Sequence, residues 1–192
     1  RICRHNHITC PACSKVCAVC EEGFCEKHGI AACHLDSAPA CSLHARRCSS
    51  CRREHCSAHE NECSEGGHKA CDACLGPCGV CGRIVCTTHG VQSKADTPKG
   101  ARLLCRACVV YCEGGTNEPV GRDEVVRCAS CEKFVCSHHQ ATCAVDRQVH
   151  CSKHLRRADR SRRLLCEGHR SQCAHEPHVL FGSDEIQACA TC

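Results

Sequence analysis

The chain has 192 residues, of which 29 are Cys and 16 are His, and its formal net charge is +4. Leu, Ile, Val and Phe supply only 31 residues, and the chain has one Tyr, no Trp and no Met. These side chains are too few to bury a core that offsets the conformational entropy of folding, which excludes an ordinary globular domain held by apolar packing.

The pattern of the cysteines indicates metal sites instead of disulfides. Their number is odd, and they recur as C-x2-C and C-x2-H pairs, in which His has no role for a disulfide but is a common zinc ligand. The sequence has no signal peptide and no apolar run near the roughly 18 residues that a membrane span needs. We therefore expect zinc in a reducing compartment, cytoplasmic or nuclear, and neither a membrane nor a small-molecule substrate as partner.

In chain order, the ligand pairs predict a series of small units. These are the end of an upstream zinc unit at 1–9, zinc units at 10–34, 41–68, 71–108 and 112–150, a zinc-binding linker with basic residues at 151–169, and the start of a truncated unit at 173–192. The incomplete ends predict an internal piece of a longer array.

The units are repeats. The spacing C-x2-C-x4-C-x2-H begins at Cys17, Cys48, Cys78 and Cys128. A shift of 61 residues also superimposes distant segments without a gap, including Gly121, Asp123 and Glu124 on Gly182, Asp184 and Glu185. A register kept over this length indicates a tandem array.

Local structure is expected to be minimal. Phe24, Val85 and Val135 precede the third ligand of a core segment, as in the second strand of a short hairpin. The next C-x2-H predicts a helical turn, with room for full helices only after His89 and His154. Residues 120–127, and their copy at 181–188, predict a Gly turn followed by a strand. The predicted fold class is small, irregular, zinc-stabilised α+β: a tandem array of hairpin-plus-helical-turn modules, like beads on a string.

The order of the pairs resembles the B-box family of cross-braced zinc domains, which are relatives of the treble clef. Those domains carry a C-x2-C pair, a short β-turn, a C-x2-[CH] pair and a terminal pair that contains His. The resemblance covers most of the chain and is one of spacing class. The first linker is shorter here, and the last pair is Cys/His where the family usually has two His.

The resemblance implies interleaved ligand pairs, first with third and second with fourth, and about nine zinc ions in all. The implied sets are Cys10, Cys13, Cys25, His28; Cys17, Cys20, Cys33, His34; Cys41, His44, Cys56, His59; Cys48, Cys51, Cys63, His68; Cys71, Cys74, Cys86, His89; Cys78, Cys81, Cys105, Cys108; Cys128, Cys131, Cys143, His150; Cys151, His154, Cys166, His169; and Cys112, Cys136, His139 with an unnamed fourth ligand. Cys173, Cys189 and Cys192 belong to the last, truncated unit. In the alternative scheme, each C-x2-C-x4-C-x2-H segment holds one ion by itself.

Two basic clusters are candidates for contact with nucleic-acid phosphates. One comprises Arg46, Arg47, Arg52 and Arg53, and the other comprises Lys153, Arg156, Arg157, Arg160, Arg162 and Arg163. If the second cluster is helical, Arg156, Arg160 and Arg163 share one face. Zinc-bound thiolates bring the formal charge close to neutral, so any such contact is local. The alternative for both clusters is a solvated surface.

The sequence carries no signature of a catalytic zinc site, a phosphate-binding loop, a dinucleotide site or a nucleophile elbow. We therefore expect no enzymatic activity in this segment. The leading hypothesis is a structural zinc-binding repeat array, an interaction arm of a larger protein that handles DNA or RNA. The alternative is a protein–protein or self-association module, the use to which B-box-like domains are mostly put. Metal buffering or thiol redox sensing is a third hypothesis, which the regular spacing disfavours.

Overall fold

The computed structural model describes residues 7–8, 11–25, 29–94, 98–115, 117–172, 174 and 176–185. The contacts of the chain divide it into two compact units. The first unit comprises residues 1–91 and 103–107, and the second comprises residues 92–102 and 108–192. The smaller units expected from the sequence stay predictions.

The first unit consists of short antiparallel hairpins joined by turns. Its hairpins are β1 (Ser14–Val16) with β2 (Gly23–Cys25), β3 (Ile30–Ala32) with β4 (Pro39–Cys41), β5 (Ala45–Arg47) with β6 (Glu54–Cys56), β7 (Glu60–Glu62) with β8 (Lys69–Cys71), and β9 (Leu75–Pro77) with β10 (Ile84–Cys86). The 3-10 turns are η1 (Pro11–Cys13), η3 (Ser57–His59) and η4 (Asp72–Cys74), β12 (Leu103–Leu104) belongs to this unit, and β11 (Val91–Gln92) lies at its boundary in the sequence.

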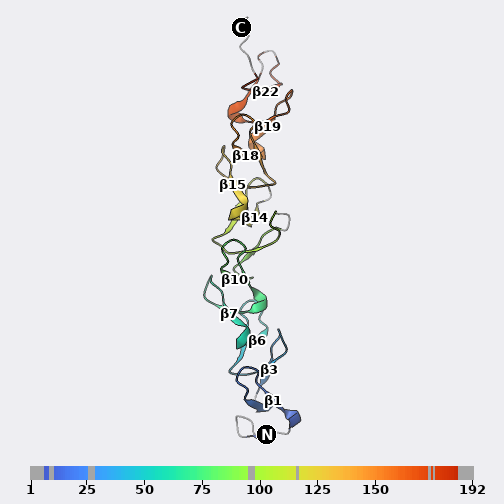
Figure 1. The fold of residues 1–192 in the computed structure, drawn as a ribbon, viewed down its shortest axis with the longest axis vertical. Coiled ribbons are helices and arrows are strands. Elements are labelled where there is room, and N and C mark those ends of the chain that lie inside the picture. The colour runs from blue at the N-terminus through green and yellow to red at the C-terminus, as the bar shows by residue number, and fades with distance from the viewer. Residues whose placement is uncertain are drawn as a thin grey trace. The chain divides into compact units, whose positions relative to one another are not determined.

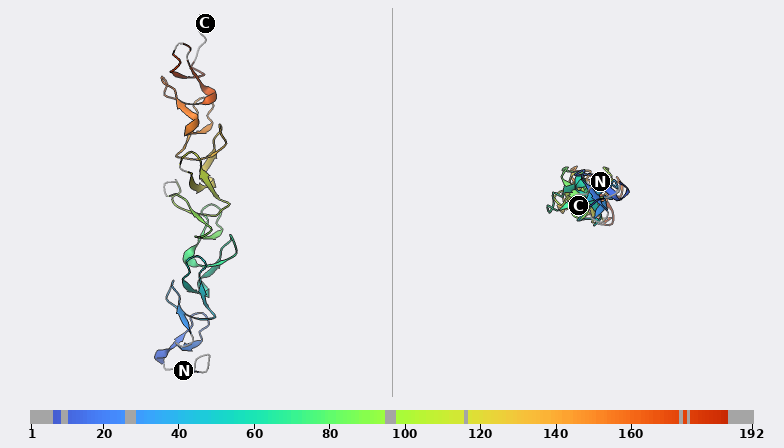
Figure 2. Two further views of the ribbon diagram at one scale, coloured as in Figure 1. Left: turned by 180° about the vertical axis from the view of Figure 1, so that it is seen from behind. Right: turned by 90° about the horizontal axis from the view of Figure 1, so that it is seen from below.

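The second unit follows the same plan. Its hairpins are β13 (Val109–Cys112) with β14 (Glu118–Gly121), β15 (Val125–Arg127) with β16 (Phe134–Cys136), β17 (Gln140–Thr142) with β18 (Val149–Cys151), β19 (Leu155–Arg157) with β20 (Leu164–Cys166), and β21 (Arg170–Gln172) with β22 (Leu180–Gly182). The turns are η5 (Arg122–Glu124), η6 (Ser152–His154) and η7 (Glu167–His169). Within each unit the hairpins succeed one another in chain order, as the views in Figure 1 and Figure 2 both show.

A tight loop closes each of these short hairpins. In the loop between β5 and β6, the Arg52 amide donates to the Cys48 carbonyl at 3.0 Å. Arg52 has a left-handed φ of 64°, and Glu21 and Glu132 have φ of 59° at the corresponding loop positions. The turn from Cys48 to Arg52 thus reverses the chain within five residues.

The apolar core of each hairpin is very small. One side chain is buried at the position before the Cys that ends the second strand: Phe24, Ala40, His55, Ala70, Val85, Val135, His150 and Leu165. Thiols supply most of the rest, as in the cluster of Cys143, Leu155 and Cys166. Packing of this size cannot fold the chain by itself, as the composition predicts.

The predicted strands at Phe24, Val85 and Val135 are confirmed as β2, β10 and β16. Residues 120–127 form the expected turn and strand, η5 and β15, whereas their copy at 181–188 is described only as far as residue 185.

The prediction of full helices is wrong for the described residues, which form no α-helix. His154 leads directly into β19, which pairs with β20 so that Leu155 lies opposite Cys166. Leu155 is buried and the next two residues are exposed. The pairing of β19 with β20 sets which residues face inward, and it is this pairing that buries Leu155. No described helix is long and apolar enough to cross a membrane.

The hairpins are not isolated beads. Within the first unit β1 contacts β4 and β3 contacts β6, and within the second unit β15 contacts β18 and β17 contacts β20. Each hairpin therefore packs on the next one, and these contacts position the cysteines described below.

Candidate metal centres

Cys and His side chains gather where the loop of one hairpin meets the turn that follows the next hairpin. We call each such gathering a donor set, its two halves the loop pair and the turn pair. In the first unit the donor sets with all ligand atoms within 4.8 Å of one another include Cys17, Cys20, Cys41, His44; Cys33, Asp36, Cys56, His59; Cys48, Cys51, Cys71, Cys74; and Cys63, His68, Cys86, His89. Such Cys/His sets can hold metal ions.

Cys78 and Cys81 also lie in a hairpin loop of the first unit, between β9 and β10. The Cys81 Sγ lies 3.7 Å from the Cys105 Sγ, and the Cys105 amide donates to the Cys78 Sγ at 3.4 Å. Cys108 completes the C-x2-C motif that Cys105 begins. Within the first unit, the expected grouping of Cys78 and Cys81 with Cys105 therefore agrees with the structure.

The second unit contains further sets of the same kind. The His139 Nδ1 lies 3.3 Å from the Sγ atoms of both Cys112 and Cys136. The His169 Nδ1 lies 3.1 Å from the Cys166 Sγ and 3.7 Å from the Cys143 Sγ, with the Asp146 carboxylate at 3.3 Å. The third gathering contains Cys128, Cys131 and Cys151, and His154 follows Cys151 in η6.

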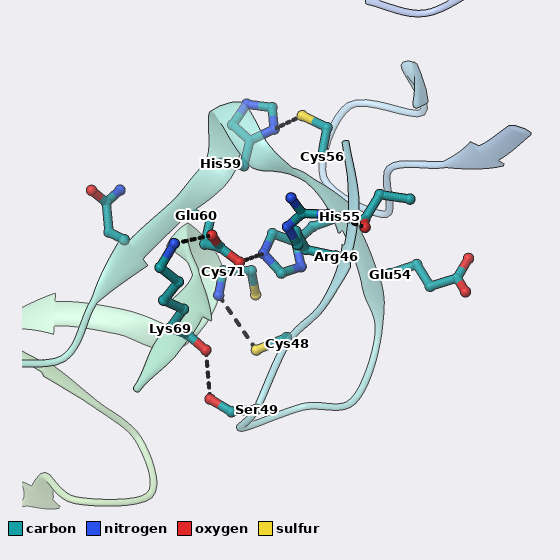
Figure 3. Close-up of polar contacts among 12 residues, drawn as sticks. Arg46, Cys48, Ser49, Glu54, His55, Cys56, His59, Glu60, Lys69 and Cys71 are labelled. Atoms are coloured by element: carbon teal, nitrogen blue, oxygen red, sulfur yellow. Dashed lines mark hydrogen bonds and ion pairs between the residues drawn. The ribbon is translucent and has the colours of Figure 1, made fainter. Parts of the chain in front are cut away.

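Figure 3 shows the meeting of the hairpin β5–β6 with the hairpin β7–β8. The Cys71 amide donates to the Cys48 Sγ at 3.4 Å, and the Ser49 hydroxyl donates to the Lys69 carbonyl at 2.6 Å. Lys69 also pairs with Glu60 at 3.0 Å. The loop of one hairpin is thereby fixed against the second strand of the next, and the four thiols of this set converge.

The same amide–sulfur bond recurs from set to set. The amide of the Cys that starts the turn pair donates to the first Sγ of the loop pair, at 3.2–3.5 Å: Cys41 to Cys17, Cys71 to Cys48, Cys86 to Cys63, Cys136 to Cys112, Cys151 to Cys128 and Cys166 to Cys143. This bond orients the sulfur lone pairs and stabilises the thiolate, which is the form that binds metal.

The electrostatics divide the thiols of a set into two kinds. Burial raises the pKa of Cys48, but hydrogen bonds from the amides of Cys71 and Cys51 outweigh burial and hold the pKa at about 6, below the ordinary 9.0. Burial raises the pKa of Cys74, and the neighbouring thiol of Cys71 raises it further. Four thiols this close cannot ionise together unless a cation compensates their charge.

At two junctions of the second unit, an arginine and two carboxylates take the place of a donor set. Arg102 pairs with Asp123 at 3.0 Å and with Glu124, and Arg163 pairs with Asp184 at 2.9 Å and Glu185 at 3.2 Å. Ser93 and Gly121, and likewise Ala158 and Gly182, occupy the positions that hold the first Cys of the loop pair and of the turn pair elsewhere. At these two junctions the ion pair, in place of a donor set, connects the loop side of the junction to the turn side.

The junction keeps its backbone geometry in both forms. The amide after the first loop position donates to the strand of the next hairpin in metal-type junctions, as Ala129 does to Val149 at 2.9 Å. Lys94 makes the equivalent bond to Pro119 at 3.4 Å, and Asp159 makes it to Leu180 at 3.0 Å.

The predicted grouping of the ligands is wrong in most sets. Cys17 and Cys20 meet Cys41 and His44, not Cys33 and His34, and the same displacement by one pair recurs along the array. The reason is strand length. Cys17 follows β1 at the loop end of its hairpin, whereas Cys25 ends β2 opposite Ser14, about 10 Å away for a three-residue strand. A loop pair therefore cannot share an ion with the turn pair of its own hairpin, which is what the sequential scheme requires. It also cannot share an ion with the loop pair of the next hairpin, which is what the interleaved scheme requires.

Two predicted groupings agree with the structure, the one that begins at Cys78 and the one of Cys112, Cys136 and His139. In both, the loop pair was matched with the turn that follows the next hairpin.

Other predicted ligands lie apart from the sets expected for them. The His34 Nε2 lies 3.7 Å from the Cys71 Sγ, and the His34 Nδ1 lies 2.9 Å from the Glu54 carbonyl. His150 is buried with its Nδ1 2.9 Å from the Ser130 hydroxyl. Cys13 is exposed, and the Cys25 Sγ lies 3.9 Å from the His7 Nδ1. The predicted ligands that fall outside the described residues are Cys10, His28, Cys173, Cys189 and Cys192.

Sequence reasoning missed two carboxylates, Asp36 and Asp146. Each lies three positions after the first Cys of a loop, where other sets have Cys20 or Cys51. A signal for them exists, because the first loop Cys and the first turn Cys are 23 residues apart in several sets. At that spacing, the sets that begin at Cys33 and Cys143 each lack a fourth Cys or His, and the Asp of a C-x2-D motif could supply an oxygen ligand instead.

The two basic clusters lie in equivalent hairpins, β5–β6 and β19–β20, and not on a helix. The Arg47 Nε donates to the Arg52 carbonyl at 2.9 Å, and Arg157 makes the same contact with the Arg162 carbonyl at 3.0 Å. These four side chains are exposed. Arg160 lies in the second loop and faces the Phe181 ring at 5.3 Å, and Lys153 lies in η6. The predicted helical face of Arg156, Arg160 and Arg163 is therefore wrong.

No disulfide is present among the described cysteines. Comparisons with known protein families, with curated proteins and with solved structures gave no match for this chain. The chemistry of the donor sets must therefore carry the argument about function.

Proposed function

We propose that the chain is a structural zinc-binding repeat module, without catalytic activity, that works in a reducing compartment. The separations of the donor atoms support zinc. Tetrahedral zinc with Zn–S near 2.3 Å and Zn–N near 2.0–2.1 Å requires about 3.8 Å between two sulfurs and about 3.6 Å between sulfur and nitrogen. The Cys51 and Cys71 sulfurs are 3.8 Å apart. The His44 Nδ1 lies 3.7 Å from Cys17 and 3.2 Å from Cys41.

Zinc in these sets has a structural task. Each ion joins the loop of one hairpin to the turn that follows the next, at a place where the apolar core is one side chain. The free energy of metal binding thus becomes free energy of folding, as in other small zinc domains. The number of ions, about nine for the whole array, is part of the proposal.

Elemental analysis of the reduced, purified chain tests the metal. We expect zinc in an amount close to one ion per donor set, together with protection of the cysteines from alkylation. Fewer than about six ions per chain, with the remaining cysteines reactive in freshly reduced protein, would overturn the proposal.

We further propose that the arginine hairpins bind nucleic-acid phosphates. The observation that supports this is the repetition of one arrangement, because Arg47 and Arg52 in one unit and Arg157 and Arg162 in the other make the same contact and are all exposed. Maintaining four like charges in two equivalent loops costs electrostatic energy, which a polyanion would relieve.

Binding of mixed-sequence DNA and RNA at several salt concentrations tests this second part. We expect an affinity that falls steeply with salt and a smaller slope for the double variant Arg52→Glu/Arg157→Glu. Arg106→Glu is the control, because Arg106 is exposed but already lies 4.0 Å from the Glu65 carboxylate. Equal affinity for the double variant and the control would overturn the proposal. If neither nucleic acid binds while the chain self-associates, the B-box type of protein–protein module replaces it.

A further inference from the structure

One donor set differs from the others in its loop pair. Cys112 ends β13, and Cys136 and His139 form the turn pair. The three donor atoms are close together: the His139 Nδ1 lies 3.3 Å from each sulfur, and the Cys136 amide donates to the Cys112 Sγ at 3.3 Å. Both cysteines are buried, at 1% and 6% exposure. This part of the set has the geometry of the four-donor sets.

The fourth position of this set is a glycine. Three residues after the first loop Cys, most other sets carry a Cys or Asp: Cys20, Asp36, Cys51, Cys81, Cys131 or Asp146. The loop at Cys63 has Gly66 there and takes its fourth donor from His68, whereas the loop at Cys112 has Gly115 and no His at its end. The backbone of the loop lies directly against the His139 ring. A Cβ at Gly115 would lie 2.4 Å from the His139 Nε2, and one at Gly114 would lie 2.5 Å from the His139 Cβ. A donor side chain at these positions would displace the ring.

The neighbouring carboxylate is engaged elsewhere. Glu113 directly follows Cys112, and its carboxylate pairs with the Lys133 ammonium at 2.9 Å. Glu113 thus serves the loop by an ion pair with the next hairpin, in contrast with Asp146, whose carboxylate lies 3.9 Å from the Cys166 sulfur.

We infer that the metal ion held by Cys112, Cys136 and His139 keeps one coordination position for an exogenous ligand. Two thiolates and one neutral imidazole leave a divalent ion with no net charge, so the ion retains Lewis acidity. A water molecule takes the position by default, and a small thiolate replaces it, because soft sulfur ligands suit zinc. This inference depends on the proposed metal binding and goes beyond it, since a purely structural ion needs no free position.

Replacement of zinc by Co²⁺ in the full chain, followed by titration with 2-mercaptoethanol under a phosphine reductant, tests the inference. Tetrahedral Co²⁺ absorbs visible light according to its ligands, so only an ion with an exchangeable position changes its spectrum. We expect a change that corresponds to one ion per chain.

Two opposite substitutions sharpen the test. In the set at Cys63, His68 lies opposite the first loop Cys, because the Cys63 amide donates to the His68 carbonyl at 3.0 Å. Glu118, the first residue of β14, holds that place opposite Cys112. Glu118→His should therefore close the position and abolish the thiol response without loss of metal. His68→Asn should open a second position and double the response.

The outcomes separate the two proposals. A chain that binds no Co²⁺ refutes the proposed metal binding itself. A chain that binds Co²⁺ in its other sets but not through Cys112, or that binds it there with no response to thiol, refutes the free position and leaves the structural proposal intact.

Discussion

Two kinds of junction join successive hairpins. Comparing them separates the backbone contacts that set the geometry of a junction from the interactions that stabilise it. At the junction of β5–β6 with β7–β8 four thiols converge, whereas at Arg102 a guanidinium meets Asp123 and Glu124. The backbone bond from loop to strand is present in both types. The backbone hydrogen bonds of the hairpins therefore set the geometry of a junction. The guanidinium of Arg102 supplies the positive charge in one type, and the proposed metal ion would supply it in the other.

The difference lies in strength. A structural zinc ion in a zinc-finger peptide contributes about 10–16 kcal/mol at neutral pH. An exposed ion pair contributes about 0–1 kcal/mol, and removing the partner of a buried charged group costs about 1–3 kcal/mol. The described metal-type junctions of the second unit, from Cys112 to Cys166, lie between the two weaker junctions in the chain. Four experiments would break or sharpen this comparison.

The largest effect should follow removal of metal. A strong chelator should abolish the cooperative thermal transition and most amide protection in both units, because one buried side chain per hairpin cannot replace the lost ions. Circular dichroism and hydrogen exchange measure this, and excess zinc added back is the control. A cooperative transition that persists in metal-free protein would contradict the claim that metal-type junctions supply most of the stability.

The next effect is the loss of one metal-type junction. Cys71→Ala removes a ligand from the set with Cys48, Cys51 and Cys74, and we expect the affinity of that set for zinc to fall by more than about 100-fold, since loss of a mere outer hydrogen-bond partner of a ligand costs up to that much. Alkylation followed by mass spectrometry should label Cys48, Cys51 and Cys74.

The same labelling pattern discriminates among the pairing schemes. Labelling of Cys86 in place of Cys48 and Cys51 would favour the interleaved scheme, and no new labelling at all would favour the sequential scheme, in which Cys71 holds no ion. The set at Cys128 is the internal control, and its cysteines should stay protected.

A smaller effect is expected at the ion-pair junctions. Arg102→Ala leaves the Glu124 carboxylate, which is only 4% exposed, without its partner, and we expect a loss of about 1–3 kcal/mol in local stability. Arg163→Ala is the matched variant and should cost less, because the Asp184 side chain is 45% exposed and water can replace the arginine. Hydrogen exchange of β15 and of β22 measures the two, and equal losses would contradict the role of burial.

The smallest expected effect is the response of the ion-pair junction to mild acid. The hydrogen bond from Arg102 lowers the pKa of Asp123 from 3.8 to about 2. A lowered pKa means that the contribution to stability is complete above the unfolded pKa and is lost only as the pH falls through about 2. Carbon NMR of the Asp123 carboxyl should therefore show no titration between pH 7 and 5. A midpoint above 4 would show that the pair is absent in solution.

The sequence predicted the chemistry of the sites better than their connectivity. Cys/His spacing sufficed for the metal sets and for strands at Phe24, Val85 and Val135, because both depend on neighbours within a few residues. Pairing depends on which hairpin ends lie side by side, and a three-residue strand moves Cys25 away from Cys17 in a way that no local motif records. The helix expected after His154 failed for a similar reason, since tertiary pairing with β20 and not local preference decides the state of Leu155.

The 61-residue copy of Gly121, Asp123 and Glu124 was visible in the sequence, but its meaning was not. Without the register of the hairpins, nothing connects these residues to Arg102 or Arg163. In the structure, these residues and their copies occupy the position of a turn pair, and their carboxylates pair with an arginine instead of binding metal. This explains why both copies lack cysteine there.

The division of every donor set between two successive hairpins limits how such a chain can change length. Each hairpin contributes one loop half to the set ahead of it and one turn half to the set behind it. Loss or duplication of a whole hairpin leaves complementary halves facing each other, so the array can shorten or lengthen by that step and still bind its ions. Loss of a single strand would leave two incomplete sets, and evolution by insertion and deletion should therefore proceed in whole hairpins.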